Sequence, residues 1–349
     1  MGNMLGNSGK VLKTARLFAR VGLKGMTPLK GYRLLRYWVL DNVFKMQIPW
    51  LIELSVTYRC QCGCAHCSVS NYFDEANKRK KEELTKDEIN SVLDQAVKMG
   101  IPKVDYFGGE PLLRKDIVEL VSLGASKGLY MSLTTNGWLL TREMVKALKQ
   151  SGISCINISL DSVSEEEHDR LRTLPGLFKK ATDGVRYCYE EGIPCITSTY
   201  VTRERMRNFG PGENDDSDLT KVILLSRQLK ASGIRILFPI ISGEWVNDAG
   251  KGFSQEDARK VIDNIDPSFA FIEGAFSVKS KSKVCQSLSG KMFNISPYGE
   301  VQLCVAFTNV FGNVKDAPLK EVLKSMYSHP TFIKNKNSSC CSTNELKKC

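Results

Sequence analysis

The sequence predicts an α/β fold with a parallel sheet, because six short apolar runs alternate with longer helix-like stretches from residue 51 onward. The runs lack polar alternation, which is typical of strands that are covered on both faces. Six such units occupy about 190 residues, whereas a closed eight-stranded barrel needs about 250. We therefore expect a partial (β/α)6 TIM-like barrel. A basic helical segment precedes it and a small α+β domain follows it.

The elements follow one another in a regular order along the chain. The predicted strands are Leu51–Val56, Lys103–Phe107, Tyr130–Thr134, Cys155–Leu160, Cys195–Val201 and Ile234–Ile241. The predicted helices lie near residues 85–99, 114–127, 141–151, 178–191 and 217–232. Thr85, with Glu88 three residues later, is a capping-box pattern and predicts the start of the first of these helices. Asn208–Asp218 is acidic and rich in turn formers, so we expect an exposed loop there.

Composition places the chain among ordinary globular proteins. It has 349 residues, of which 42% are hydrophobic and 25% are charged. No run of about 20 apolar residues exists, so no transmembrane helix is expected. Basic residues interrupt every apolar stretch near the start, which argues against a secretory signal. We expect a cytoplasmic protein, with peripheral membrane contact as an alternative, and thiols that bind metal rather than form disulfides.

The most informative motif is Cys60-x3-Cys64-x2-Cys67, which follows the first predicted strand. Three thiolates on one loop can hold three corners of a cubane iron–sulfur cluster, which normally takes four cysteines. The remaining iron then has an open position for a cofactor or substrate. A zinc site is the alternative, with Cys62 as a fourth ligand, although the spacing differs from two separated Cys-x2-Cys pairs.

This sequence resembles the radical S-adenosylmethionine (radical SAM) enzymes, whose signature has this cysteine spacing after the first barrel strand. The resemblance implies that SAM chelates the open iron and that reductive cleavage releases a 5′-deoxyadenosyl radical. That radical would abstract hydrogen from an unidentified peptide, lipid or small metabolite. A reductant such as flavodoxin or ferredoxin is implied as a partner. The rival interpretation is a non-catalytic metal-binding or electron-transfer protein.

Motifs after the next two strands agree with this resemblance. Gly108 and Gly109 remove side chains, so that backbone polar groups can approach a small charged ligand closely. With Glu110 they match a family motif that binds the SAM amino group. Thr135 and Asn136 end the third run and match a family motif near the cofactor, although Asn-Gly is also a common turn.

Four further residues are candidates for cofactor contacts. Ser159 and Asp161 end the fourth run, where their oxygens suit ribose hydroxyls or cap a helix. Arg203 follows the fifth run and its guanidinium could pair with the SAM carboxylate, or it could simply be solvated. His66 stands where the family usually has an aromatic residue near adenine.

The end of the sequence carries a second set of cysteines. Two alternating runs around Pro297-Tyr-Gly-Glu predict a β-hairpin between Cys285 and Cys304. Gly299-x4-Cys304 resembles the SPASM and twitch extensions of radical SAM enzymes, which bind auxiliary clusters. The resemblance implies one auxiliary [4Fe–4S] cluster, and a zinc site is the alternative. Its predicted ligands are Cys285, Cys304 and two of Cys340, Cys341 and Cys349.

The first fifty residues are strongly basic. Nine Lys or Arg residues stand against one acid, Asp41, within a chain of net charge +11. Helical spacing predicts amphipathic helices, which could pack on the barrel base, contact a membrane surface through residues 10–45, serve as a targeting peptide or bind an acidic partner. Nucleic acid is not expected. The predicted divisions are a helical segment over 1–48, a barrel over 49–246 and a cluster domain over 247–349.

Overall fold

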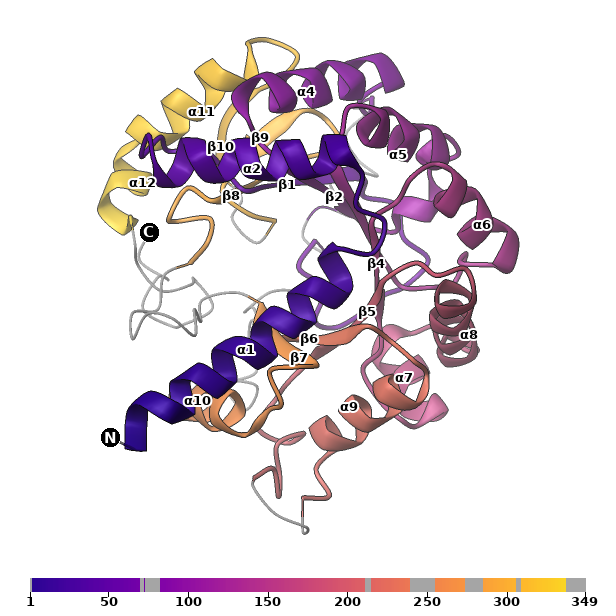
Figure 1. The fold of residues 1–349 in the computed structure, drawn as a ribbon. Coiled ribbons are helices and arrows are strands. Elements are labelled where there is room, and N and C mark those ends of the chain that lie inside the picture. Colours follow the sequence, from indigo (N-terminus) through magenta and orange to yellow (C-terminus); the bar gives the residue numbers. More distant parts are fainter. Residues whose placement is uncertain are drawn as a thin grey trace.

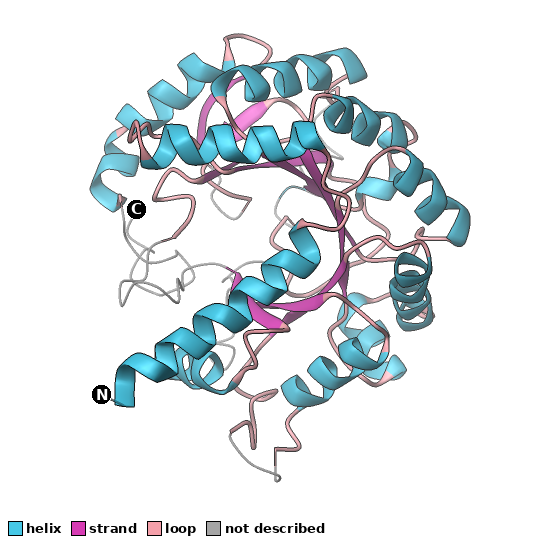
Figure 2. Ribbon diagram, in the orientation of Figure 1, coloured by secondary structure: helices cyan, strands magenta, loops and turns pink. Residues whose placement is uncertain are grey.

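The computed structural model describes residues 2–69, 72, 82–210, 215–238, 255–273, 285–305 and 309–336, with side chains from residue 12 onward except at residues 255 and 273. Its strands form one curved sheet in the order β10-β9-β8-β1-β2-β3-β4-β5-β6-β7 (Figure 1). Neighbouring strands from β1 to β7 are parallel, as are β1 and β8. The sheet curls without closing, which confirms the predicted partial barrel (Figure 2).

The barrel strands match the predicted apolar runs closely. They are β1 (Leu51–Thr57), β2 (Lys103–Gly108), β3 (Tyr130–Thr135), β4 (Cys155–Ser159), β5 (Cys195–Tyr200), β6 (Gly233–Leu237) and β7 (Ala270–Glu273). The seventh was not predicted, because its four-residue run is too short to stand out as a strand. The predicted sixth run extends to Ile241, but residues 239–254 lie outside the described part of the chain.

Helices cover the outer face of the sheet (Figure 2). They are α4 (Lys86–Met99), α5 (Ile117–Ser126), α6 (Arg142–Gln150), α7 (Glu165–Arg172), α8 (Leu177–Glu190), α9 (Asp218–Gln228) and α10 (Gln255–Asn264), with the short η2 (Pro111–Leu113) before α5. The capping box predicted at Thr85 and Glu88 is present at the start of α4. Residues 211–214 of the predicted loop before α9 lie outside the described residues.

The two faces of the sheet differ in polarity. Tyr106 of β2 points to the helices and its hydroxyl donates to Leu120 O of α5 at 2.9 Å. The preceding residue, Asp105, therefore faces the barrel interior. It accepts from Thr134 Oγ1 of β3 at 2.9 Å, and Asn157 Nδ2 of β4 donates to Thr134 Oγ1 at 3.1 Å. The interior is thus lined by polar side chains that satisfy one another.

The predicted hairpin is present and continues the same sheet. Strand β8 (Met292–Ile295) pairs antiparallel with β9 (Glu300–Gln302), and β10 (Val310–Asn313) pairs with β9. Helices α11 (Leu319–Ser328) and α12 (Pro330–Asn335) follow. The predicted domain boundary near residue 247 lies outside the described residues, and the domain limits stay predictions.

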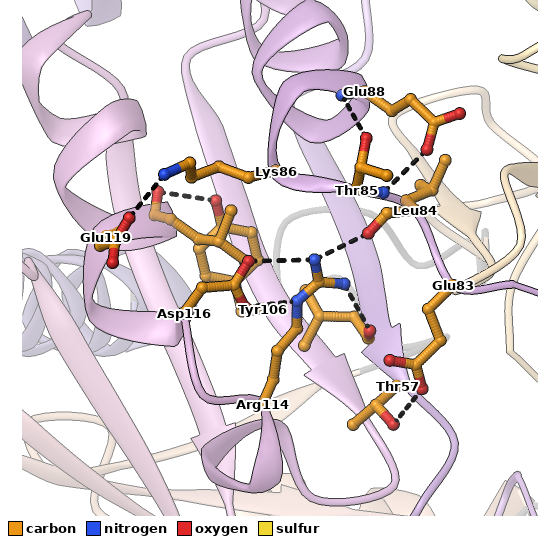
Figure 3. A network of polar contacts seen from close by, with 12 residues as sticks. Thr57, Glu83, Leu84, Thr85, Lys86, Glu88, Tyr106, Arg114, Asp116 and Glu119 are labelled. Atoms are coloured by element: carbon orange, nitrogen blue, oxygen red, sulfur yellow. Dashed lines mark hydrogen bonds and ion pairs between the residues drawn. The ribbon is translucent and has the colours of Figure 1, made fainter.

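A buried arginine joins the end of β1 to the helices beside it (Figure 3). Arg114 donates to Val56 O at 3.1 Å and to Leu84 O at 2.7 Å, and its Nε lies 2.7 Å from Asp116 Oδ1. Two carbonyls and a carboxylate thus satisfy one buried cation. Because Val56 precedes the cysteine loop by only four residues, this network fixes the point from which the loop starts.

Helix α2 (Pro28–Asn42) lies across the base of the barrel. Lys30 Nζ donates to Gly152 O at 3.1 Å, Arg33 Nε to Lys127 O at 3.2 Å and Arg36 Nη1 to Val97 O at 2.7 Å. These carbonyls lie in or just after the last turns of α6, α5 and α4, where the helix dipole is negative. Three basic residues of the amphipathic segment are therefore used in packing, as one of the alternatives predicted.

Helix α1 (Gly2–Gly22) also meets the base. Leu17 is buried, Arg20 Nη1 donates to Ser232 O at 3.4 Å, and the Tyr130 hydroxyl donates to Val21 O at 3.3 Å. Ser232 and Tyr130 stand at the beginnings of β6 and β3, so α1 lies at the N-terminal ends of the strands. Within the part of the chain that the structure describes, no helix has the length and apolar character needed to cross a bilayer.

Candidate active site

The cysteine loop leaves β1 at the C-terminal edge of the sheet and packs against the turn after β2. Gly109 N donates to Thr57 O and Glu110 N to Arg59 O, both at 2.8 Å. A Cβ at Gly108 would lie 2.1 Å from Thr57 O, and one at Gly109 would lie 2.3 Å from Arg59 O. Both positions therefore require glycine, and they bring the turn against the loop backbone.

The loop thiols receive several hydrogen bonds. Cys62 N donates to Cys60 Sγ at 3.4 Å, Asn136 Nδ2 lies 3.9 Å from the same sulfur, and Arg172 Nη1 lies 3.9 Å from Cys64 Sγ. The hydrogen bond from the Cys62 thiol lowers the pKa of Cys60 and brings the pKa of Cys64 to about 7. Donors of this kind favour the thiolate that a metal needs.

The donor set fits an iron–sulfur cluster. Cys60, Cys64 and Cys67 are partly exposed at the mouth, whereas Cys62 is buried and Asn136 Nδ2 donates to its sulfur at 3.4 Å. Hydrogen bonds to ligating sulfurs are the means by which proteins tune such clusters. Across the described ranges, no three His, Cys, Asp or Glu side chains converge as a single metal ion requires.

Glu110 ties the turn after β2 to the end of β3. Its buried carboxylate accepts from Leu112 N at 3.0 Å, Thr135 Oγ1 at 2.7 Å and Asn136 N at 2.8 Å. Burial raises the pKa of Glu110 to about 7, although the three donors act in the opposite direction. The carboxylate therefore holds Asn136 beside the cysteines, and the structure brings Glu110, Thr135 and Asn136 together.

A second buried carboxylate organises the opposite side of the loop. Asp161 Oδ2 lies 2.7 Å from Arg172 Nε and 3.7 Å from His66 Nε2. Burial by itself raises the pKa of Asp161. The charge of Arg172 and, to a lesser extent, the two nearby histidines lower this pKa by more, so it ends well below its usual range. The His66 ring lies 4.5 Å from that of Tyr200, centroid to centroid. Ser159, the last residue of β4, is partly exposed at this edge.

The predicted site residue Arg203 forms an ion pair with α10 instead of joining Asp161 and its partners. Arg203 Nε donates to Asp257 Oδ2 at 2.9 Å, and 54% of its side chain is exposed. Two residues later, Arg205 turns back and donates to Thr199 Oγ1 at 3.0 Å and to Tyr200 O. Its Nη2 is buried and has no hydrogen-bond partner among the described residues. Arg205 is thus the arginine of this segment that lies half-buried beside β5.

Sequence reasoning missed Arg172 and His168, which both lie on α7. His168 Nδ1 accepts from Asp161 N at 3.1 Å, and burial lowers the pKa of His168 to about 4. Their four-residue spacing puts them on one face of a helix, which was the available signal. Helix α7 itself was not predicted, because its eight residues are mostly charged and show no apolar periodicity.

The second cysteine set is described only in part. Cys285 is buried, and Cys304 follows β9 and is partly exposed. Cys340, Cys341 and Cys349 lie outside the residues that the structure describes. A small apolar cluster of Tyr58, Val69, Tyr72 and Val305, with Cys67 against it, joins the first cysteine loop to the segment after Cys304. The two sets are therefore linked by packed side chains.

The buried histidine generates a prediction about pH. Because folding lowers the pKa of His168 from 6.5 to about 4, the unfolded chain binds more protons between these values. Stability should therefore fall as the pH is lowered from about 6.5 to about 4, by up to about 3 kcal/mol from this group. In His168→Asn an amide oxygen can replace the ring acceptor without titrating. Urea unfolding across this pH range should show a weaker pH dependence for the variant, and an equal dependence would contradict the assignment.

Comparisons with known proteins agree with this geometry. Residues 54–217 match the family model of the radical SAM superfamily, and residues 285–349 match the SPASM model, an iron–sulfur cluster-binding domain. An AdoMet-dependent heme synthase of Methanosarcina barkeri is 28% identical over 214 residues, which are 61% of this chain and 57% of that protein. A PqqA peptide cyclase of Bradyrhizobium diazoefficiens is 28% identical over 283 residues, which are 76% of this chain and 69% of the relative. The first three curated relatives match over only 57%, 50% and 42% of their own lengths.

Solved structures show the same fold. Streptococcus suis SuiB bound to its precursor peptide SuiA has a TM-score of 0.65 at 16% identity, over 86% of this chain and 70% of that one. Native anSMEcpe with bound AdoMet has a TM-score of 0.61 at 17% identity, over 82% and 83%. Members of the matched family are enzymes, and the two matched domains imply [4Fe–4S] clusters and SAM. The chain therefore belongs to the radical SAM superfamily and carries a SPASM iron–sulfur cluster-binding domain.

Proposed function

We propose that this chain cleaves SAM reductively to a 5′-deoxyadenosyl radical and uses it to abstract hydrogen from a substrate. The observation that carries the proposal is the cysteine loop itself. Three partly exposed thiols stand at the C-terminal edge of the barrel, and donors from the end of β3 and the end of α7 lie within reach of their sulfurs. A [4Fe–4S] cluster held there, with SAM bound, would supply the one-electron chemistry.

The chain's own residues hold and tune the cluster. Cys60, Cys64 and Cys67 are its proposed ligands. Asn136 and Arg172 lie within 3.9 Å of two of these sulfurs, where they would stabilise negative charge on the cluster. Cys62 belongs to the same loop, but its side chain is buried and it is not a proposed ligand.

Four other groups are proposed to orient SAM. The turn at Gly108–Glu110 is the proposed site of the amino group, and Ser159 and Asp161 are the proposed acceptors for the ribose hydroxyls. Arg172 is the proposed partner of the SAM carboxylate, because it is a buried cation beside Cys64. The His66 and Tyr200 rings form a surface on which adenine can stack.

The substrate class that we propose is a peptide, and the electron comes from a reductant such as flavodoxin or ferredoxin. The PqqA peptide cyclases of Bradyrhizobium diazoefficiens and Gluconobacter oxydans align with 76% and 78% of this chain, whereas the heme synthase of Methanosarcina barkeri aligns with 61%. The barrel interior above Asp105 is polar, which suits a hydrogen-bonding substrate better than an apolar one.

The substrate proposal can be tested with defined compounds. Synthetic peptides encoded by short reading frames beside the gene are incubated with the reconstituted enzyme, SAM and dithionite. One of them should increase 5′-deoxyadenosine formation and change in mass, because a bound substrate consumes the radical. Iron coproporphyrin III serves as the comparison compound. Stimulation by the porphyrin, with none by any of the peptides, would exclude the peptide assignment in favour of a tetrapyrrole.

Cysteine variants test the cluster assignment. Cys60→Ala, Cys64→Ala and Cys67→Ala should each abolish 5′-deoxyadenosine formation, because a cluster with two protein ligands is not retained. Cys62→Ala is the matched control within the same loop and should keep both the iron and the activity. Cys304→Ala should lose the auxiliary cluster, so iron falls from about eight to about four per chain. Loss of the SAM cluster in Cys62→Ala alone would contradict the ligand set.

Arg172 can be tested apart from the cluster. Arg172→Gln should weaken SAM binding at least about tenfold, because a charge-assisted hydrogen bond to the carboxylate is lost. Equilibrium dialysis on reconstituted protein of equal iron content measures this. Arg170→Gln, on the same helix with 68% of its side chain exposed, is the control and should bind normally. Equal affinity in the two variants would remove Arg172 from the proposed SAM site.

A further inference from the structure

Exposed apolar side chains are concentrated on the first two helices. Of the fifteen large apolar side chains that are exposed among the described residues, ten lie between residues 12 and 46. Single exposed apolar residues are normal, but a concentration marks an interaction surface. The ten are Leu12, Phe18, Leu23, Leu29, Tyr32, Leu35, Trp38, Val43, Phe44 and Met46.

Helix α1 divides into three stripes with a spacing of three or four residues. A stripe that packs on the barrel contains Thr14, Leu17 and Val21. An exposed basic stripe contains Lys13, Arg16, Arg20 and Lys24. An exposed apolar stripe contains Leu12, Ala15, Ala19 and Leu23, with Phe18 beside it. At 100° per residue the apolar stripe faces directly away from the barrel and the basic stripe flanks it.

Helix α2 repeats this pattern with aromatic residues. Tyr32, Leu35 and Trp38 recur every three residues on its outer side, and each is at least 55% exposed. Its basic residues point the other way, into the carbonyls at the ends of the barrel helices. The outer side of α2 is therefore apolar, and the exposed positive charge of this face comes mainly from α1.

Residues 1–50 themselves contribute little negative charge. Asp41 is the one acid of residues 1–50, and its carboxylate forms an ion pair with Lys291 of the barrel base. Exposed Lys and Arg beside exposed aromatic and aliphatic side chains are the composition of helices that lie in a lipid interface. An anionic headgroup layer satisfies both stripes at once, because phosphates meet the cations while the apolar side chains enter the acyl boundary.

We propose that the outer face of α1 and α2 binds the surface of an anionic phospholipid bilayer. A second copy of this face fits less well, because residues 1–50 offer the basic stripe no acidic group other than Asp41. An acidic protein or a nucleic acid would pair with the basic stripe but leave Trp38 and Phe18 in water. The inference is independent of the SAM chemistry, since none of these residues belongs to the proposed active site.

The position of this face has a consequence for access to the active site. Both helices meet the N-terminal ends of the strands and lie in front of the sheet in Figure 1, whereas the cysteine loop leaves the C-terminal ends. The seven residues of β1 span about 20 Å. A bilayer under α1 and α2 is therefore at the opposite end of the barrel from the mouth. The contact would locate the enzyme at the membrane while its substrate arrives from the aqueous side.

Vesicle flotation with the full-length, cluster-loaded protein tests the proposal. The probes are phosphatidylcholine vesicles with and without about one-third phosphatidylglycerol. The protein should float with the anionic vesicles, and added salt should reduce the bound fraction. Lys13→Glu/Arg16→Glu and Leu35→Ser/Trp38→Ser should each lower the partition coefficient at least about tenfold. Both should form 5′-deoxyadenosine at the normal rate without vesicles.

Matched controls use equally exposed residues elsewhere. Lys320→Glu/Lys324→Glu on α11 and Tyr189→Ser/Leu224→Ser on α8 and α9 should leave vesicle binding within about twofold. The proposal is overturned if the wild type does not float, if neutral vesicles bind it equally, or if the controls lose binding to the same extent. Light scattering that shows a dimer abolished by Leu35→Ser/Trp38→Ser, without vesicle binding, would assign the face to a second copy. Binding of an acidic polymer instead of vesicles would assign it to an acidic partner.

Discussion

The parallel direction of β1 to β5 is the constraint on which the site depends. Parallel strands deliver their carboxyl ends to one edge, so loops far apart in the sequence meet there. The cysteine loop, the Gly108–Glu110 turn, Asn136 and Asp161 each follow a different strand and are in contact through hydrogen bonds or packed backbone. The glycines make this possible at the closest point, because no side chain fits between the turn and the loop.

Two buried carboxylates then hold these neighbouring segments in fixed positions. Glu110 holds the end of β3 through Thr135 and Asn136, and Asp161 holds α7 through Arg172. Asn136 and Arg172 in turn each lie within 3.9 Å of a cysteine sulfur. A buried ion pair is seldom a large source of stability, but it is costly to break, so it holds one arrangement of its surroundings. Here that arrangement sets the hydrogen bonds to the sulfurs.

The barrel also separates two kinds of surface. Its C-terminal edge carries the thiols and the polar groups proposed for SAM, and its N-terminal edge is closed by α1 and α2. The basic residues of α2 donate hydrogen bonds to carbonyls at the C-terminal ends of α4, α5 and α6. These bonds explain why so basic a segment packs against the barrel. The residues left outside are apolar and, on α1, cationic. A membrane contact at that edge and chemistry at the other do not compete for space.

The sequence by itself determined the fold class, because apolar runs and helical spacing report burial residue by residue. It also determined the cysteine loop, since Cys60, Cys64 and Cys67 lie within one short segment whose spacing is specific. It could not reveal that Arg172 and His168 contact Asp161, that Arg205 rather than Arg203 packs against β5, or that Lys30, Arg33 and Arg36 cap barrel helices. Those facts depend on which way a side chain points after a turn and on which distant carbonyl or carboxylate lies within reach. Only the tertiary structure decides this, because the partners lie anywhere from 5 residues apart, for Arg205 and Tyr200, to 122 residues apart, for Lys30 and Gly152.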